Sequence, residues 1–183
     1  MDTPVLVITG PSGVGKGTLI SGLLERIPGL ELAVSATTRP PRKGEVDGRD
    51  YHFLSPEQFE ERVRAGDFVE HAVYAGNRYG TLRSELDREA RGIVLEIDLQ
   101  GARQVRGTLP EAHQVFVAPP SLEELRERLK RRGSDSPEQI GERLALAPQE
   151  LAAREEFERV VVNDDLERAR DELVELAGTM CPQ

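Results

Sequence analysis

A glycine-rich turn that directly follows a short apolar run constrains this chain more than any other segment. Residues 5–8 are all apolar, and after one threonine the chain reads GPSGVGK. This spacing fits the first seven positions of the phosphate-binding loop G-x-x-x-x-G-K-[ST], in which backbone N–H groups, the next helix N-terminus and a lysine surround a phosphate. An ordinary glycine-rich turn requires neither the lysine nor that spacing. The sequence therefore predicts a nucleotide-phosphate site formed by Gly10, Pro11, Ser12, Gly13, Val14, Gly15 and Lys16.

The residue after the lysine departs from this pattern. Gly17 stands where a Ser or Thr hydroxyl would ordinarily contact Mg²⁺, and the next hydroxyl belongs to Thr18. Mg²⁺ usually keeps several of its water molecules, so the missing hydroxyl does not exclude the metal. The sequence G-K-G-T, with Gly17 and Thr18 in the binding loop, resembles the phosphate loop of adenylate kinases and other nucleoside monophosphate kinases. The loop alone indicates a nucleoside triphosphate and leaves the reaction open.

Short apolar runs alternate with helical patterns along the chain, which predicts an α/β fold. Unbroken apolar runs suit parallel strands that are covered on both faces. The predicted strands are residues 5–9, 93–97, 115–117 and 160–162. Helices are predicted at 18–26 and after Ser121 and Ser136, because each serine precedes a Glu or Gln by three residues. Pro148 interrupts the last of these patterns and predicts a kink in the helix or its division.

Composition narrows the function classes. A chain of 183 residues fits one domain, and its net charge of −9 argues against broad binding to nucleic acid or to an anionic membrane. With Cys181 as the single cysteine no intrachain disulfide can form, which favours a reducing compartment. No apolar run approaches the ~20 residues of a membrane span, and the N-terminus shows no secretory signal. We therefore expect a cytoplasmic protein, and the sequence leaves its oligomeric state open.

Residues 35–81 differ from the rest of the chain and are predicted to form a small inserted lobe. The segment is rich in Arg, Pro, Gly and Tyr, and it places Arg39, Arg42 and Lys43 close together. Guanidinium forks donate paired hydrogen bonds to phosphate, and prolines would hold the segment extended. On composition alone, a solvated basic loop is the alternative.

The motifs around these arginines resemble the guanylate kinase family. The matching segments are SATTRPPR at 35–42, FVEHA at 68–72, GNRYGT at 76–81, EIDLQG at 96–101, PPS at 119–121 and VNDD at 162–165. The resemblance implies a P-loop nucleoside-monophosphate-kinase fold with a parallel-sheet core, an inserted GMP-binding lobe and a helical lid. The implied division is 1–34 core with the phosphate loop, 35–81 GMP-binding lobe, 82–125 core, 126–143 lid and 144–183 core.

The resemblance also implies an acceptor site. Four residues would hold the phosphate of GMP, namely Arg39, Arg42, Tyr51 and Tyr79, and three would face the base, namely Ser35, Glu70 and Thr81. One carboxylate can accept from both N1–H and the 2-amino group of guanine, and a hydroxyl can donate to O6. Such a site can reject adenine by roughly 10⁴-fold. Without the motifs, Glu70 would be read as a surface carboxylate and the tyrosines as packing residues.

Two carboxylates, Glu96 and Asp98, end the predicted strand 93–97 on the same face. At the carboxyl end of a parallel strand they would lie near the bound phosphates and the guanine. Asp98 could orient Mg²⁺ through water, although no residue is predicted to ligate the metal directly. Many guanylate kinases have Asp at the place of Glu96, and helix capping is the alternative role for Glu96.

Arginines crowd residues 126–132, and Arg143 follows on the next predicted helix. Glutamates lie between these arginines, so a solvated helix face with no role in binding is the alternative interpretation. The resemblance implies that Arg128, Arg132 and Arg143 belong to or adjoin a lid that closes over the phosphates and excludes water. The implied catalytic residues are Lys16, Arg39, Arg132 and Arg143, while Arg128 and Asn163 would contact ATP. Asn163 could otherwise simply end the last strand.

These implications amount to phosphoryl transfer from ATP, with Mg²⁺, to GMP and dGMP. An adenylate-kinase-like enzyme acting on another monophosphate is one alternative, suggested by Gly17 and Thr18. The other is a catalytically silent guanylate-kinase-like module that binds proteins. Lys16, Arg39 and Glu70 are all present, which argues against that silent module.

Overall fold

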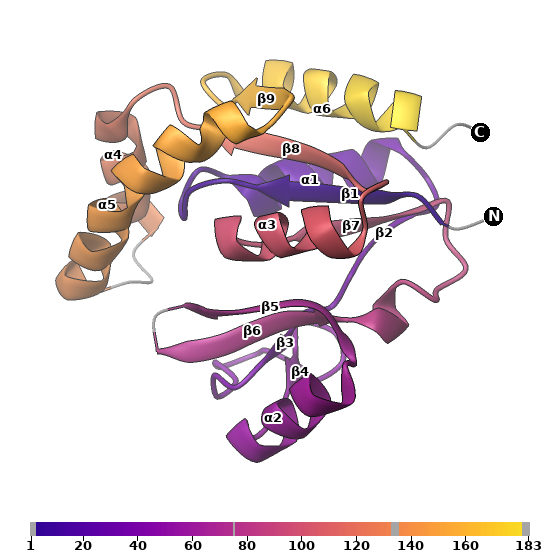
Figure 1. The fold of residues 1–183 in the computed structure, drawn as a ribbon. Helices are drawn as coiled ribbons and strands as arrows, with labels where there is room; N and C mark the ends of the chain where they lie inside the picture. The colour runs from indigo at the N-terminus through magenta and orange to yellow at the C-terminus, as the bar shows by residue number, and fades with distance from the viewer. Residues whose placement is uncertain (1–2, 75, 133–135, 181–183) are drawn as a thin grey trace.

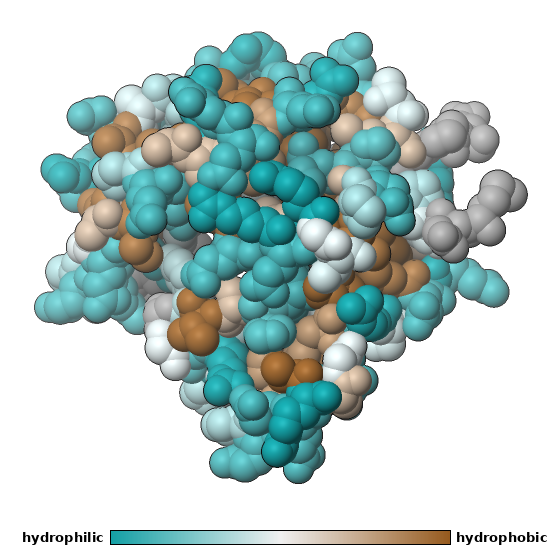
Figure 2. Space-filling view, in the orientation of Figure 1, coloured by the Kyte–Doolittle hydropathy of each residue, from teal (hydrophilic) through white to brown (hydrophobic). Residues whose placement is uncertain are grey.

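The computed structural model describes residues 3–74, 76–132 and 136–180, with the backbone alone for Arg132. Two sheets and their helices make up the fold, and the second sheet lies below the first in Figure 1. Cys181 lies outside the described residues. None of the described helices is long and apolar enough to cross a membrane. The face in Figure 2 is mainly hydrophilic, with apolar side chains in separate small patches.

The first sheet forms the core and has the strand order β2-β7-β1-β8-β9. Its strands are β1 (Val5–Thr9), β2 (Leu30–Leu32), β7 (Gly92–Glu96), β8 (His113–Ala118) and β9 (Arg159–Val162). Every neighbouring pair is parallel, so the carboxyl ends of all five strands meet at one edge. The α/β fold and the four predicted strands are confirmed, with small shifts at their ends. The short strand β2 was not predicted.

Successive residues of the core strands face opposite sides of the sheet, and each side is covered by helices. Leu6 and Ile8 belong to one buried cluster, which includes residues from α1 (Lys16–Arg26), α4 (Leu122–Arg132) and α6 (Leu166–Met180). Val7 belongs to the other cluster, which includes residues from α3 (Leu99–Thr108). This sandwich explains why the strand sequences are apolar without interruption.

The second sheet has the order β4-β3-β6-β5 and is formed by residues between 36 and 82. Its strands are β3 (Ala36–Thr37), β4 (His52–Phe53), β5 (Phe68–Tyr74) and β6 (Asn77–Leu82), and its helix is α2 (Pro56–Ala65). A small core of its own holds it together, in which the rings of Phe59 and Phe68 stack with centroids 4.5 Å apart. The proposed division of the chain into core, lobe and lid stays a prediction.

Helix α5 (Pro137–Ala152) runs through Pro148 without a break, so the predicted division of the helix at this proline does not occur. A proline inside a helix costs about 3 kcal/mol or more. Packing on both sides of the proline offsets this cost: Leu144 and Ala147 join the first buried cluster, and Leu151 packs against the second. Tertiary contacts therefore hold the helix in one piece.

Candidate functional site

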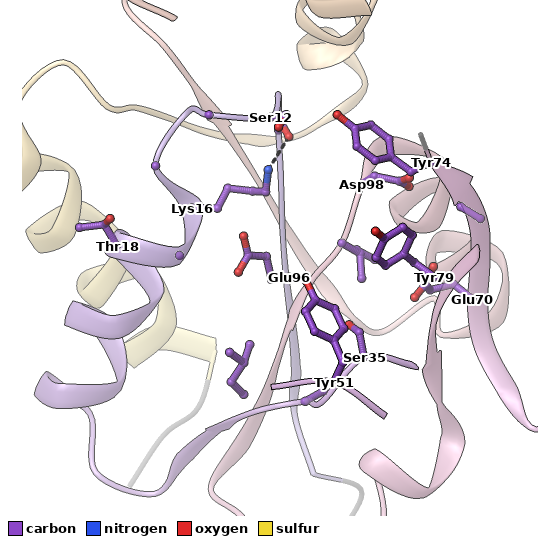
Figure 3. A pocket seen from close by; sticks show the side chains of 18 of the residues that line it. Ser12, Lys16, Thr18, Ser35, Tyr51, Glu70, Tyr74, Tyr79, Glu96 and Asp98 are labelled. Carbon is purple, nitrogen blue, oxygen red and sulfur yellow. Dashed lines mark hydrogen bonds between the residues drawn. The ribbon is translucent and has the colours of Figure 1, made fainter. Parts of the chain in front are cut away.

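A cavity of about 910 Å³ opens at the carboxyl edge of the core sheet and faces the second sheet (Figure 3). The loop after β1 forms one end, and β5 and β6 form the other end. Glu96 at the end of β7, the two residues that follow it and Glu150 of α5 also line the cavity. This volume lies in the upper range of small-molecule sites. A parallel sheet is expected to bind its ligand at this edge.

The phosphate loop forms one end of the cavity, as the motif predicts. Gly15 caps α1 with φ 100°, and a Cβ at this position would lie 2.6 Å from Asn163 Nδ2, so only glycine fits. The first turn of α1 therefore begins at the cavity, and Lys16, Gly17 and Thr18 line it. Lys16 Nζ donates to the carbonyls of Gly10, at 2.8 Å, and of Pro11, at 3.2 Å. The lysine thus lies folded back on its own loop.

Two residues predicted to contact ATP instead brace the loop from outside in this structure. Asn163 is 5% exposed, and its Nδ2 donates to the Val14 carbonyl at 2.8 Å. Arg128 donates to the same carbonyl at 3.2 Å and to the Asn163 carbonyl at 2.8 Å. Neither residue lines the cavity, and their contact with ATP stays a prediction.

Arg143 brings helix α5 to the phosphate loop. Its guanidinium donates to Ser12 Oγ and lies 5.9 Å from the ring centroid of Tyr74, within cation–π distance. Arg143 therefore joins α5, the loop after β1 and strand β5. The side chain of Arg132, which was also predicted to be catalytic, lies outside the described residues.

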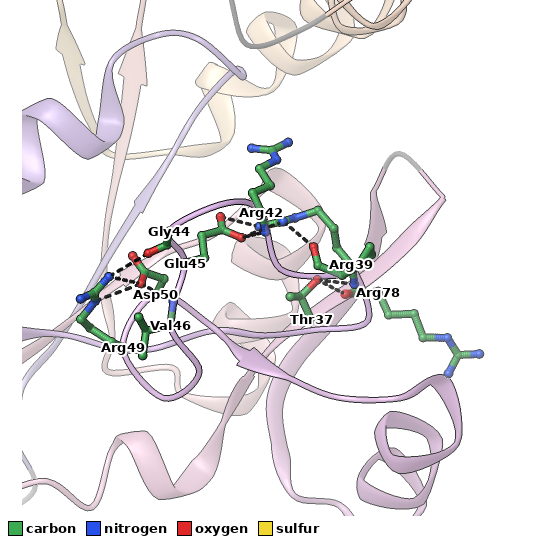
Figure 4. Close-up of polar contacts among 10 residues, drawn as sticks. Thr37, Arg39, Arg42, Gly44, Glu45, Val46, Arg49, Asp50 and Arg78 are labelled. Atoms are coloured by element: carbon green, nitrogen blue, oxygen red, sulfur yellow. Dashed lines mark hydrogen bonds and ion pairs between the residues drawn. The ribbon is translucent and has the colours of Figure 1, made fainter.

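Glu45 organises Arg39 and Arg42 in the loop that follows β3. Arg39 donates to both oxygens of Glu45, at 2.8 and 2.9 Å, and the backbone N–H of Arg42 donates at 2.6 Å (Figure 4). These bonds, with that from Arg39 the largest cause, lower the pKa of Glu45 to about 2. Figure 4 shows the Arg42 side chain extending away from this pair. In this segment the Arg39 guanidinium is therefore held in place by Glu45, whereas the Arg42 side chain extends away from it.

Tyr51 and Tyr79 line the cavity with their rings in edge contact, 6.2 Å between centroids. The guanidinium carbon of Arg39 lies 5.1 Å from the centroid of the Tyr51 ring. Burial, the largest cause, raises the pKa of Tyr51, so its hydroxyl stays protonated and able to donate. The tyrosines and Arg39 thus form one cluster. Neither Arg39 nor Arg42 lines the cavity, and the role of these four residues in holding the GMP phosphate stays a prediction.

Glu70 lies at the opposite end of the site and is bonded to Thr81, which is buried and does not itself line the cavity. Glu70 is 4% exposed and lines the cavity together with Ser35, while Thr81 Oγ1 donates to Glu70 Oε1 at 2.8 Å. Burial raises the pKa of Glu70 to about 7, the Thr81 bond opposes this shift, and the charge of Asp98 adds to it. A carboxyl group with this pKa, facing a cavity, is a candidate for ligand recognition.

Glu96 and Asp98 both line the cavity, but their roles differ. Asp98 caps α3, with its Oδ1 accepting from the Gly101 N–H at 2.8 Å. Helix capping, considered above for Glu96, therefore belongs to Asp98 instead, because β7 ends at Glu96 and the helix begins at Leu99. Glu96 Oε2 lies 3.8 Å from the place of a Cβ on Gly17. A carboxylate thus stands beside the position where the loop lacks its usual hydroxyl.

The family model for guanylate kinase matches residues 2–178. The chain belongs to the guanylate kinase family. A guanylate kinase of Frankia casuarinae is 54% identical over 173 residues, which cover 93% of this chain and 94% of the relative. One of Synechococcus sp. (strain CC9311) is 56% identical over 170 residues, 91% and 90% of the two chains. The crystal structure of guanylate kinase from Anaplasma phagocytophilum matches with a TM-score of 0.75 at 30% identity, covering 100% of this chain and 88% of that one. The expected P-loop kinase fold is confirmed.

The cavity is also lined by side chains that sequence reasoning missed, among them Tyr74 from β5 and Glu150 from α5. Burial, the largest cause, raises the pKa of Glu150, while the charges of Lys16 and Arg143 oppose the shift. Glu150 follows Arg143 by seven residues, or about two helical turns, so both face the same side of α5. That spacing is the one signal that could have found it.

Proposed function

We propose that this chain transfers the terminal phosphoryl group of ATP to GMP, and also to dGMP, giving ADP and the nucleoside diphosphate. One observation carries the proposal: a single cavity has a phosphate loop at one end and the buried Glu70–Thr81 pair at the other. A carboxylate suits the adjacent donors of guanine, and the loop suits a triphosphate. Membership of the guanylate kinase family supports both assignments.

The proposed mechanism needs no nucleophilic side chain, because a phosphate oxygen of GMP attacks the donor. Lys16 and the loop N–H groups hold the triphosphate, and Arg143, with Arg132, neutralises charge on the transferring group. Two of the N–H groups of Arg39 are occupied by Glu45, so Arg39 acts as a fixed support. The extended Arg42, with Tyr51 and Tyr79, then captures the GMP phosphate.

Mg²⁺ is proposed to accompany ATP. Among the described residues, no three His, Cys, Asp or Glu side chains are grouped so that they could hold a metal ion. Mg²⁺ is commonly bound through substrate phosphates, its own waters and one or two carboxylates. Glu96 and Asp98 line the same cavity as the loop and would hold the ion through water. The bound ion would neutralise charge on the donor phosphates.

A coupled assay with ATP, Mg²⁺ and each of GMP, AMP, UMP and CMP tests the proposal. We expect turnover with GMP and little with the other three. Preference for AMP would favour the adenylate-kinase-like alternative, which Glu70 argues against. Turnover with none of them would favour the silent protein-binding module. The cytoplasmic location inferred from composition stays a prediction.

The efficiency of GMP use is expected to rise with pH through about 7. Below that pH, the buried Glu70 is protonated in the free enzyme and cannot accept from both donors of guanine. Because kcat/KM reports the free enzyme, its pH profile should contain an ionisation near 7. The folded pKa lies above the ordinary value of 4.5, so the stability that Glu70 contributes is full at low pH and is lost as pH rises towards 7.

The variant Glu70→Gln separates this ionisation from that of the substrate. The GMP phosphate itself titrates near pH ~6 and should appear in both profiles. The ionisation near 7 should be missing from the variant, and its melting temperature should depend less on pH between 5 and 8. Identical profiles for both proteins would contradict the assignment to Glu70.

A further inference from the structure

Gly101, in the first turn of α3, lies directly behind the carboxylate of Glu70. It is buried, and a Cβ built on it would lie 2.4 Å from Glu70 Oε2 and 3.0 Å from Glu70 Cδ. Ordinary contact between such atoms begins at roughly 3.4 Å. Position 101 thus requires glycine, because the Glu70 carboxylate occupies the space that any larger side chain would need.

The same glycine also joins the two acidic residues at this end of the cavity. Its N–H donates to Asp98 Oδ1, while its bare Cα lies against Glu70. The other oxygen of Glu70, Oε1, accepts from Thr81 Oγ1. The carboxylate is therefore fixed on two sides, by a hydroxyl from β6 and by the start of α3. Glu70 also lines the cavity.

We propose that Gly101 is a positioning residue that sets the place of the Glu70 carboxylate and thereby the selectivity for guanine. The inference rests on the proposed role of Glu70 in reading the base. A methyl group at position 101 must displace the carboxylate by roughly 1 Å to restore ordinary contact. That movement breaks the bond to Thr81 or enters the space reserved for the guanine donors. The phosphate loop lies at the other end of the cavity and is not affected.

The variant Gly101→Ala tests the proposal, with Gly107→Ala as its matched control. Gly107 lies on the same helix, is exposed, and has nothing within 4 Å of an added Cβ. We expect Gly101→Ala to lower kcat/KM for GMP by on the order of 10- to 100-fold, mainly through KM. KM for ATP should stay within about twofold of wild type, because the phosphate loop lies at the other end of the cavity. Gly107→Ala should behave like wild type in every respect.

Inosine monophosphate, which lacks the 2-amino group, provides a readout that a purely structural role would not change. The wild-type preference for GMP over inosine monophosphate should shrink in Gly101→Ala and persist in Gly107→Ala. Adding Glu70→Asp to Gly101→Ala withdraws the carboxylate by one methylene. The kcat/KM of the double variant for GMP should therefore be higher than the value expected if the losses of the two single variants were simply additive in free energy.

The outcomes separate this inference from the function on which it rests. If Glu70→Gln impairs GMP use while Gly101→Ala keeps wild-type efficiency and selectivity, the role of Gly101 is overturned alone. If Glu70→Gln has no effect either, the base-reading role of Glu70 is overturned. Equal losses for ATP and GMP in Gly101→Ala also overturn the inference. If Gly101→Ala does not fold, the double variant decides: recovery of the fold supports the contact with Glu70, and failure to recover overturns it.

Discussion

Replacing Lys16 by alanine is expected to lower kcat by about 10³-fold or more while the protein stays folded. Lys16 is the first residue of α1, and in the proposed mechanism its ammonium group neutralises charge on the transferring phosphoryl group. Catalysis of this kind consists mainly of positioning and electrostatic stabilisation. Its bonds to the Gly10 and Pro11 carbonyls are partly exposed, so the fold should lose little. Steady-state kinetics and a thermal melt of the same preparation measure both effects.

Lys130→Ala is the matched control for this variant. Lys130 lies on α4, its side chain is 55% exposed, and it pairs with Glu127 at 2.9 Å, outside the cavity. Its removal deletes the same charge and should leave kcat unchanged. A Lys16→Ala enzyme with kcat within tenfold of wild type would contradict the role given to Lys16, and so would equal losses in the two variants.

Features of the site that depend on local sequence were predictable. The turn from β1 into α1 is specified by glycines at fixed spacing, and an apolar strand and a helical pattern flank it. The core strands were predicted because a strand buried on both faces must be apolar throughout. The capping box at Ser136 likewise placed the start of α5 correctly, since both of its hydrogen bonds are local.

Features that depend on how the folded chain brings side chains together were not predictable. Composition alone offered a solvated basic loop for Arg39, whereas the folded segment brings Glu45 onto its guanidinium. Tyr74 and Glu150 stand far apart in sequence, and only the packing of α5 against the sheets brings both to the cavity. Helix capping was considered only as an alternative role for Glu96, whereas Asp98 caps α3, because sequence patterns locate the ends of elements only to within one or two residues.

Glu70→Gln is expected to lower kcat/KM for GMP by about 10²- to 10³-fold and to leave KM for ATP close to wild type. The glutamine amide has the same shape as the carboxylate, but it has one acceptor oxygen and one donor NH₂ group. Guanine presents two donors, N1–H and the 2-amino group. One of the two hydrogen bonds to guanine is therefore lost, and the NH₂ group of the amide faces a guanine donor. Thr81 Oγ1 can still donate to the amide oxygen, and burial of a neutral group removes the cost that raises the Glu70 pKa to about 7. The variant should therefore be at least as stable as wild type at pH 8.

The decisive comparison is between the two substrates of the same variant. Glu61→Gln, an exposed change on α2 in the same part of the chain, controls for the loss of one negative charge and should match wild type. If the Glu70 carboxylate reads the base, the loss must be confined to GMP, because the phosphate loop binds ATP through groups at the other end of the cavity. Equal losses for ATP and GMP would instead mean that Glu70 supports the shape of the whole cavity, and selectivity for guanine would then have to come from other residues.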